Sequence, residues 1–493
     1  MKYDVLIIGG GLGGLECGYI LSRAGQRVLI LEQGRQPGGC LQSYCRKGME
    51  FDTGFHYAGG LDEGQSLHAA FRHLGLLELP WQRLDADNFD CVTIDRHSFP
   101  FAQGHDAFAN RLAEAFPAER AALHRYADLL KRSARLQFAA FNPQSSDMDL
   151  ITELMETPAY KYLYEHFKDP LLINVLSGAS LKMELRPESL PLFAFLHGNG
   201  CFIESSWRLK GSGSLITDSL VQGIRAQGGE IVCQSEVQEL VEKDGKLTQA
   251  VCTNGETYES RLFVSDIHPA QTCRMVRNSQ RIKPLYRERI QCLPQTFGMF
   301  TVSLRFAPGR LRYFNRNHYI YRKPDVWTFH LDNRPVSGVL ASCRVPEDDS
   351  GYTRQVDLLT PMNWEYCKAW KDHRDNSYEE MKKQTADECI ALAESILPGL
   401  GEAETAYTST PLTWNRYTLT PEGSAYGLRK DCRAALQTFL SPRTPIPNLF
   451  LTGQNVGLHG LHGVTMTAFQ TCAGILGKDA VWKMLNGNCK GGN

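Results

Sequence analysis

The pattern of apolar and polar positions predicts a strand, a turn, a helix and a second strand at the start of the chain. Residues 5–8 read VLII, an unbroken apolar run typical of a strand buried on both faces of a parallel sheet. A helix is predicted after the next glycines, because Gly18 and Leu21 keep one face small and apolar. Residues 27–31 read RVLIL and predict the second strand, which ends at Glu32. These elements predict a βαβ unit within an α/β fold.

The turn between the first strand and the helix carries candidate chemistry. Gly9, Gly11 and Gly14 fit the pattern G-x-G-x-x-G, in which the first glycine permits a tight turn, the second lets a pyrophosphate approach and the third lets helix pack on strand. Phosphate then sits on free backbone N–H groups at the helix N-terminus. Glu32 is placed to accept a hydrogen bond from a ribose hydroxyl. Because all these parts occur together, they favour a dinucleotide site over a merely structural glycine loop.

The middle of the chain alternates between helical and strand-like patterns. Residues 34–60 predict a long ordered loop, and residues 66–135 are helical in character. Residues 150–203 predict short helices broken by prolines, which either enclose an apolar cavity or form a plain helical core. A glycine turn at 210–214 opens another helix. No buried strand is expected before this turn and no acid follows about 20 residues later, so we do not interpret it as a second nicotinamide site.

The second half begins with strand patterns and ends by repeating the opening logic. Residues 230–267 predict a β-meander, and four strands are predicted over 295–345: FGMFTVSLRF, HYIYRK, VWTFHL and GVLASCRV. An amphipathic helix is predicted over 376–397. Residues 449–452 predict a buried strand that runs into a glycine turn, with a helix beginning near Gly463. We expect this strand to return to the first sheet, so that a second helix N-terminus reaches the far end of the same cofactor.

Length and charge limit the class of protein. A chain of 493 residues is too long for one compact core. The 53 basic and 54 acidic side chains nearly cancel, so no global field favours nucleic acid, and a small molecule is the expected partner. The 15 cysteines are scattered without a C-x-x-C pair, which indicates reduced thiols and a cytoplasmic setting. The first strand begins at residue 3 and no apolar run reaches about 18 residues, so we expect no signal peptide and at most a peripheral membrane contact.

Several motifs together resemble a known group of flavoproteins. They are the opening fingerprint, the turn at 37–39, FDTGFHY at 51–57, the block at 210–237 and the segment at 453–463. This combination is similar to the phytoene desaturase, carotenoid isomerase and retinol saturase family, and the resemblance covers nearly the whole chain. FDTGFHY and two further stretches, VDLLTPMNWEYCKAW and STPLTWNRYTLTPEGSAYGL, are similar to the retinol saturase branch.

The resemblance implies a fold and a domain division. The expected fold is α/β, with a Rossmann-like FAD-binding domain of parallel sheet and β-meander beside a discontinuous α+β substrate domain, similar to amine oxidases and phytoene desaturases. The FAD-binding domain is expected to comprise residues 1–75, 204–290 and 441–493. Residues 76–203 and 291–440 are expected to form the substrate domain with its helical subdomain.

FAD is the cofactor that the resemblance implies, extended along motifs from both ends of the chain. The residues expected to bind it are Gly9, Gly11, Gly13, Gly14, Glu32, Gln33, Gly38, Gly39, Val237, Gly453, Gln454, Gly463 and Val464. Many members of the family carry an acid after the glycine at position 453, where this chain has Gln454 and Asn455. A neutral amide can still hydrogen-bond the ribityl hydroxyls, although the particular contact must differ.

A flavin exchanges a hydride with carbon at N5, and saturating an alkene also requires a proton donor. The candidates for this catalytic acid are His56, Tyr57 and Tyr426, whose alternative role is to line or support the flavin ring. His459 and His462 have the i, i+3 spacing of a metal pair. No carboxylate or cysteine stands beside them, so a flavin-side or structural role is favoured and no metal is expected.

Three functions are consistent with these motifs. The first is an FAD-dependent oxidoreductase that reduces a C=C bond of an apolar conjugated or isoprenoid substrate, as in carotenoid or retinoid metabolism. The second is a desaturase or cis/trans isomerase of carotenoids. The third is a non-catalytic escort protein that binds prenyl or lipid groups, against which the intact fingerprint at Gly9, Gly11, Gly14 and Glu32 argues. The sequence identifies neither the electron donor nor the acceptor.

Overall fold

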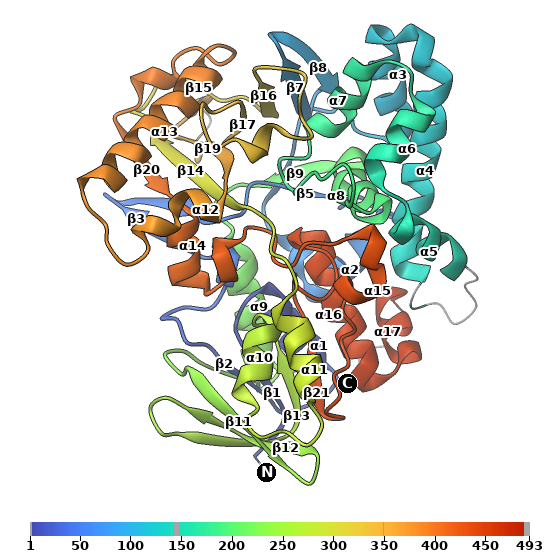
Figure 1. The fold of residues 1–493 in the computed structure, drawn as a ribbon, viewed down its shortest axis with the longest axis vertical. Helices are drawn as coiled ribbons and strands as arrows, with labels where there is room; N and C mark the ends of the chain where they lie inside the picture. Colours follow the sequence, from blue (N-terminus) through green and yellow to red (C-terminus); the bar gives the residue numbers. More distant parts are fainter. Residues whose placement is uncertain (1, 140, 142–146, 349, 488–493) are drawn as a thin grey trace.

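The framework of the protein is a pair of seven-stranded sheets. The computed structural model describes residues 2–139, 141, 147–348 and 350–487 (Figure 1). Figure 1 shows the first sheet at the bottom of the view, the second at the upper left and a group of helices at the upper right. The chain passes repeatedly between these parts, because the first sheet takes strands from the beginning, the middle and the end of the sequence.

The first sheet is built around the opening strand. Its strand order is β10 (Glu230–Val232), β2 (Val28–Leu31), β1 (Tyr3–Ile8), β13 (Thr257–Ser265), β12 (Lys246–Cys252) and β11 (Val237–Lys243), with β21 (Leu449–Leu451) beside β13. β1 pairs in parallel with β2 and β13, whereas β11, β12 and β13 form the antiparallel meander. β21 is parallel to β13, which confirms that the closing strand returns to the first sheet. The Rossmann-like α/β fold class is therefore confirmed.

Three helices pack together beside this sheet. They are α1 (Leu12–Arg23), α9 (Ser214–Ala226) and α16 (Gly460–Leu476). α1 packs against both α9 and α16, and its apolar residues Leu15, Ile20 and Leu21 are fully buried. The close fit of α1 depends on Gly18, where a Cβ atom would lie 2.8 Å from Ile30 Cδ1. The small residues of the opening pattern thus set the spacing of helix and sheet.

The second sheet is mostly antiparallel. Its order is β20 (Thr405–Ser409), β14 (Gly298–Arg305), β19 (Gln355–Met362), β17 (Gly338–Cys343), β16 (Asn317–Tyr321), β7 (Asp90–Ile94) and β8 (His97–Phe101). Only the β16–β7 pair among these is parallel. The predicted amphipathic helix forms as α13 (Asn376–Glu394) and packs against β17 and β19.

A helical group packs beside the second sheet. Its members are α3 (His105–Ala115), α4 (Arg120–Ala139), α5 (Met148–Glu156), α6 (Ala159–His166), α7 (Pro170–Gly178) and α8 (Leu192–Glu204). These helices share one apolar core with strands of the second sheet. The short helices predicted over 150–203 are therefore confirmed. The predicted division of the chain into two discontinuous domains stays a prediction.

Shorter elements complete the described fold. The helices among them are α2 (His68–Leu74), α10 (Pro269–Met275), α11 (Pro284–Gln291), α12 (Trp364–Cys367), α14 (Pro411–Thr418), α15 (Ala435–Thr438) and α17 (Lys478–Leu485). The strands pair as β3 (Ser43–Arg46) with β4 (Met49–Asp52), β15 (Leu311–Arg312) with β18 (Tyr352–Thr353), and β9 (Ser206–Leu209) with both β5 (Ala58–Gly59) and β6 (Trp81–Arg83).

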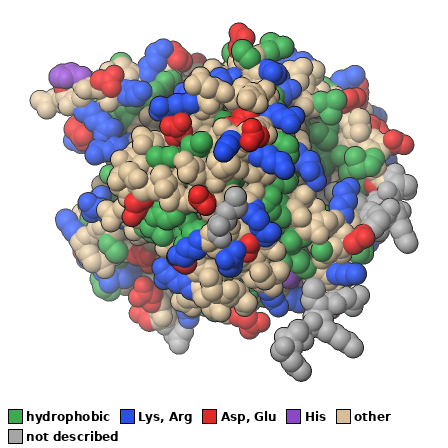
Figure 2. All heavy atoms as spheres, turned by 90° about the horizontal axis from the view of Figure 1, so that it is seen from below, with side chains coloured by type: hydrophobic (Ala, Val, Ile, Leu, Met, Phe, Trp, Pro, Cys, Tyr) green, Lys and Arg blue, Asp and Glu red, His purple; other side chains and the backbone are tan. Residues whose placement is uncertain are grey.

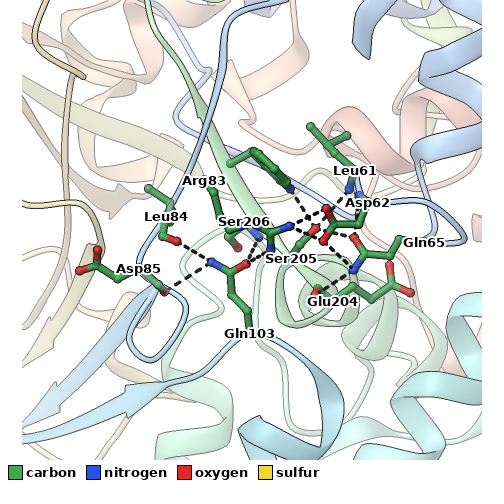
Figure 3. A network of polar contacts seen from close by, with 11 residues as sticks. Leu61, Asp62, Gln65, Arg83, Leu84, Asp85, Gln103, Glu204, Ser205 and Ser206 are labelled. Carbon is green, nitrogen blue, oxygen red and sulfur yellow. Dashed lines mark hydrogen bonds and ion pairs between the residues drawn. The ribbon is translucent and has the colours of Figure 1, made fainter. Parts of the chain in front are cut away.

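A polar network holds together four segments around the small β5–β9–β6 sheet (Figure 3). Arg83 forms an ion pair with Asp62 and donates a hydrogen bond to Gln103 Oε1 at 2.8 Å. The amide of Gln103 donates to the Leu84 carbonyl at 2.8 Å, and that of Gln65 donates to the Glu204 carbonyl at 3.1 Å. The network thereby fixes the region where the chain passes from the glycine-rich loop to the second sheet.

The structure corrects four predictions about secondary structure. Residues 66–135 are not helical throughout, because β6, β7 and β8 lie between α2 and α3. VWTFHL is not a strand: only a 3₁₀ turn forms at Phe329–Leu331, since the Val326 N–H and the Trp327 indole donate to side chains of α7. The glycine turn at 211–214 does have a strand before it, namely β9, although β9 belongs to the small antiparallel sheet. The terminal helix begins at Gly460, three residues before the predicted start.

The surface carries charges of both signs. On the face shown in Figure 2, basic and acidic side chains are interspersed with apolar ones. This agrees with the near balance of 53 basic and 54 acidic residues in the sequence. Within the ranges that the structure describes, no helix has the length and apolar character needed to cross a membrane.

Candidate cofactor and substrate site

A single cavity of about 730 Å³ connects the glycine turn of the first sheet with an apolar region against the second sheet. Of the residues expected to bind FAD, all except Gly14 line it: Gly9, Gly11, Gly13, Glu32, Gln33, Gly38, Gly39, Val237, Gly453, Gln454, Gly463 and Val464. The three candidate acids His56, Tyr57 and Tyr426 line the same cavity. The structure thus brings the predicted residues together, while their individual roles stay predictions.

The glycine turn forms an open cradle at the start of α1. Gly9 has φ +95°, which only glycine adopts without strain. A Cβ atom on Gly14 would lie 2.2 Å from the Gly9 carbonyl oxygen, so a glycine is required there for α1 to pack on the turn. Gly14 faces this contact and does not line the cavity. A Cβ atom on Gly13 would lie 2.9 Å from the backbone of Gly453. The first turn of α1 and the turn after β21 are therefore in direct contact.

Glu32 holds the backbone around the glycine turn. Its Oε2 accepts a hydrogen bond from the Gly10 N–H at 2.7 Å, and its Oε1 accepts one from the Gly34 N–H at 2.7 Å. Each carboxylate oxygen has two lone pairs, so acceptor capacity remains for a hydroxyl group in the cavity. Glu32 is thus a structural clamp in addition to its predicted role toward a ribose.

Asp266 is a buried acid at this end of the cavity that the sequence reasoning missed. It follows β13 directly, just as Gly9 follows β1, and the carboxyl ends of adjacent parallel strands meet at the binding edge of such sheets. Burial, together with the charge of Glu32, raises the pKa of Asp266 to about 7, against the N–H groups of Gly14 and Gly11, which lower it. The available signal in the sequence was an acid that directly follows the apolar end of the predicted β-meander.

A buried lysine, Lys430, holds the turn after β21 in place through hydrogen bonds to the backbone. Lys430 Nζ donates to the carbonyl oxygens of Thr438 at 2.8 Å, Asn455 at 3.2 Å and Val456 at 3.3 Å. The Asn455 side chain accepts a hydrogen bond from the Leu428 N–H at 3.0 Å, so it is committed to the protein. Gln454 and Asn455 both line the cavity.

The three candidate acids differ in how their protons are used. His56 is half-buried in the cavity wall, and its Nε2 has no hydrogen-bond partner among the described residues. Burial lowers the pKa of His56 to about 4, although the nearby Asp52 raises it, so the imidazole is neutral at pH 7. The Tyr426 hydroxyl donates to the Leu181 carbonyl at 2.6 Å. Its proton is therefore committed to the backbone.

The Tyr57 hydroxyl is the centre of a buried polar cluster. It donates to Asp90 Oδ2 at 2.9 Å, lies 2.7 Å from the Tyr319 hydroxyl and accepts a hydrogen bond from Lys182 Nζ at 3.1 Å. Asp90 also accepts from the Asn317 amide at 2.9 Å. Sequence reasoning found Tyr57 but missed Lys182 and Asp90, whose positions in the chain carry no motif.

The two histidines near the C-terminus, His459 and His462, contact different parts of the protein. His459 Nε2 donates to the Lys182 carbonyl at 2.8 Å, and its ring lies 4.6 Å from that of Tyr426. The His462 ring instead lies 6.3 Å from that of His197 on α8. Among the described residues, no group of three or more His, Cys, Asp or Glu side chains is arranged to hold a metal ion.

The other end of the cavity is apolar. Its wall includes the side chains of Phe202, Met299, Leu340, Leu359 and Leu458. Phe202 and Gly198 both belong to α8, so this helix lines the cavity. Helices α5, α6 and α7 instead pack in the core. Both alternatives weighed for residues 150–203 are therefore realised, in different helices. The cavity offers a long apolar molecule a place beside the polar groups of Tyr57 and Lys182.

Comparisons with known proteins support the resemblance inferred from the motifs. Residues 7–74 match the family model described as NAD(P)-binding Rossmann-like domain. The chain is 24% identical to human all-trans-retinol 13,14-reductase, over 96% of this chain and 86% of that protein. It is 23% identical to the chloroplastic prolycopene isomerase 1 of an Oncidium hybrid cultivar, over 86% of this chain and 75% of that protein. The predicted similarity to the retinol saturase and carotenoid isomerase group is confirmed.

The fold comparison agrees with the expected architecture. Cyclohexylamine oxidase from Brevibacterium oxydans superimposes with a TM-score of 0.60 at 13% sequence identity, over 99% of this chain and 100% of that chain. At this identity the likeness concerns the fold alone. It confirms the predicted similarity to the amine oxidase architecture.

Proposed function

We propose that this chain, a relative of all-trans-retinol 13,14-reductase and prolycopene isomerase, is an FAD-dependent oxidoreductase that reduces a C=C bond of an apolar conjugated or isoprenoid molecule. The observation that carries the proposal is the single cavity that joins the dinucleotide fingerprint to an apolar wall. Such a cavity suits an elongated cofactor whose reactive end meets an apolar substrate.

The residues of the cavity fit FAD. The N–H groups at the start of α1 would take the pyrophosphate, Glu32 would accept from the adenosine ribose, and Gln454 with the start of α16 would hold the ribityl and flavin end. The glycine turn supports this assignment, because a Cβ atom on Gly11 would lie 2.5 Å from Asp266 and a side chain there would fill the cradle. Bound FAD supplies hydride chemistry at carbon, and the protein supplies orientation, exclusion of water and a proton.

Isomerisation of a polyene is the second candidate. It is favoured by the similarity to prolycopene isomerase, which extends over 86% of this chain. Reduction and isomerisation use the same cavity and differ in whether the substrate gains hydrogen. A non-catalytic escort protein that binds prenyl or lipid groups would not require the glycine cradle, so this function is less well supported than the two enzymatic ones.

The test is anaerobic incubation of the flavin-reduced and flavin-oxidised protein with retinoids, carotenoids and steroid enones, followed by mass analysis of the products. The proposal expects a gain of two hydrogens with the reduced protein. An isomer of unchanged mass would establish the second candidate, and a loss of two hydrogens with the oxidised protein would establish a desaturase. If no substrate reacts under either condition, the enzymatic proposal is wrong.

A further inference from the structure

A largely buried cation, Lys182, lies at the apolar end of the cavity. Its side chain is 15% exposed and its Nζ lies 4.2 Å from the centroid of the Phe202 ring. The rings of Tyr57 and Tyr319 are at 5.6 and 5.7 Å. Aromatic faces stabilise an ammonium group without accepting its protons in strong hydrogen bonds. Lys182 is therefore held in the wall of the cavity as a cation that keeps protons available.

Lys182 differs from the other polar groups at the apolar end of the cavity in how many of its protons are used in hydrogen bonds. An ammonium has three N–H groups, and among the described residues the Tyr57 hydroxyl, at 3.1 Å, accepts a hydrogen bond from one of them. Asp90 Oδ2 is 3.8 Å from Nζ, beyond hydrogen-bond distance. The proton of Tyr57 is given to Asp90, and that of Tyr426 is given to the Leu181 carbonyl. Among these groups Lys182 has protons to spare.

The backbone around Lys182 is clamped from the opposite side of the cavity. Tyr426 donates to the carbonyl of Leu181 and His459 donates to the carbonyl of Lys182 itself. Both donors come from segments that are more than 240 residues away in the sequence. Side chain and main chain of Lys182 are therefore both fixed, as expected of a group that must meet a substrate in one geometry.

The charges that face Lys182 oppose one another. Burial lowers the pKa of its ammonium, whereas Asp90 on β7 and Cys201 on α8 raise it. Burial likewise raises the pKa of Asp90, and Lys182 lowers it. Tyr57 and Tyr319 also contact its ammonium, and His459 contacts its carbonyl. A lysine whose pKa is brought down toward neutrality transfers a proton more readily than an exposed one.

We propose that Lys182 donates the proton in C=C reduction, with Tyr57 and Asp90 as positioning residues that hold its ammonium. This inference rests on the proposed function. A hydride with its two electrons, ultimately from an external two-electron reductant such as a reduced nicotinamide, forms a C–H bond at one alkene carbon as the π bond breaks. The neighbouring carbon takes H⁺ from an N–H of Lys182, which leaves a neutral amine. Water returns the proton to the amine after turnover.

Two substitutions separate proton donation from charge. K182M removes both the charge and the proton, whereas K182R keeps the charge but presents a guanidinium that does not release a proton near neutral pH. K161M is the matched control, because Lys161 on α6 has an exposed side chain outside the cavity. All variants are prepared as flavin-loaded protein and reduced with dithionite under anaerobic conditions, and product formation is followed in D₂O by mass.

We expect K182M and K182R each to slow saturation by about 10²- to 10⁴-fold, the usual contribution of a general acid. The FAD content and the rate at which ferricyanide reoxidises the reduced flavin should match those of wild type and K161M. These two readouts keep a loss of cofactor distinct from a loss of the acid. The rate of saturation by wild type should also fall as pH rises and Lys182 loses its proton. The pH–rate profile of K182R should lack this decrease.

A measurement independent of turnover completes the test. In the flavin-loaded protein labelled with [¹³Cε]lysine, the signal that is missing in K182R should titrate below the exposed lysines, and in D90N it should titrate lower still. A Lys182 signal that titrates with the exposed lysines, or a K182M enzyme with the wild-type rate and pH profile, would overturn the inference alone. A wild-type enzyme that saturates no polyene would overturn the proposed function and this inference together.

Discussion

Removing Glu32 tests whether the acid at the end of β2 acts on the turn, on the cofactor, or on both. In E32A the Gly10 and Gly34 N–H groups lose acceptors that are each at 2.7 Å. A hydrogen bond to a charged group contributes about 1.5–3 kcal/mol, and water from the cavity can replace part of it. We therefore expect E32A to lower the free energy of unfolding of the apoprotein by about 2–4 kcal/mol. E32Q, which keeps one acceptor oxygen, should cost about half as much.

The same substitution removes the acceptor that the ribose assignment requires. Losing that bond should weaken FAD binding by about 10- to 100-fold, since each factor of ten corresponds to about 1.4 kcal/mol. The assays are urea unfolding of apoprotein followed by circular dichroism, and FAD titration followed by flavin fluorescence. E230A is the matched control: Glu230 lies on the neighbouring strand β10, is half-exposed, and should cost under about 1 kcal/mol. Lower stability with unchanged FAD affinity would refute the ribose role, and unchanged stability would refute the clamp.

Three further substitutions test residues in and around the cavity wall. G14A, whose Cβ atom would meet the Gly9 carbonyl at 2.2 Å, should destabilise the protein by about 1–3 kcal/mol in urea unfolding, and wild-type stability would contradict the packing argument. Because the pKa of Asp266 is raised to about 7, its carboxyl group becomes charged beside the diphosphate only as pH rises through this value, and the FAD affinity of wild type should fall there. In FAD titrations from pH 6 to 9, D266N should show a flat profile. Burial lowers the pKa of Lys430 to about 7, so unfolding takes up a proton between about pH 7 and 10; wild-type stability should therefore rise across this window relative to K430M, and parallel pH curves would be the contrary result.

The sequence predicted the first sheet well because its signals are local. The apolar run of β1, the glycine turn and the acid at 32 follow one another within about one βαβ unit. The return of β21 was predictable as well, since an apolar strand before a glycine turn repeats the same logic. The residues of these two turns line one cavity in the structure.

The second sheet was harder to predict because its pairings are remote. β7 pairs with β8, which follows it directly, but also with β16, more than 220 residues later. The second pairing, which places residues 90–94 inside the large sheet, has no local signal. VWTFHL alternates like a strand, yet Asn174 and Ser177 of α7 capture its backbone and indole N–H groups. Lys182 carries no motif, and its partners Asp90 and Tyr57 come from distant segments. Such a site becomes visible only when the fold brings the three side chains together.

We propose that the cavity between the two sheets holds FAD. The direct measurement is to purify the protein, denature it in the dark and quantify the released nucleotide by chromatography and mass, with apoprotein reconstitution as the complement. We expect a yellow protein that releases one FAD per chain, or that takes up one on reconstitution. A colourless protein that cannot be reconstituted, or one that releases only a nicotinamide dinucleotide, would contradict it.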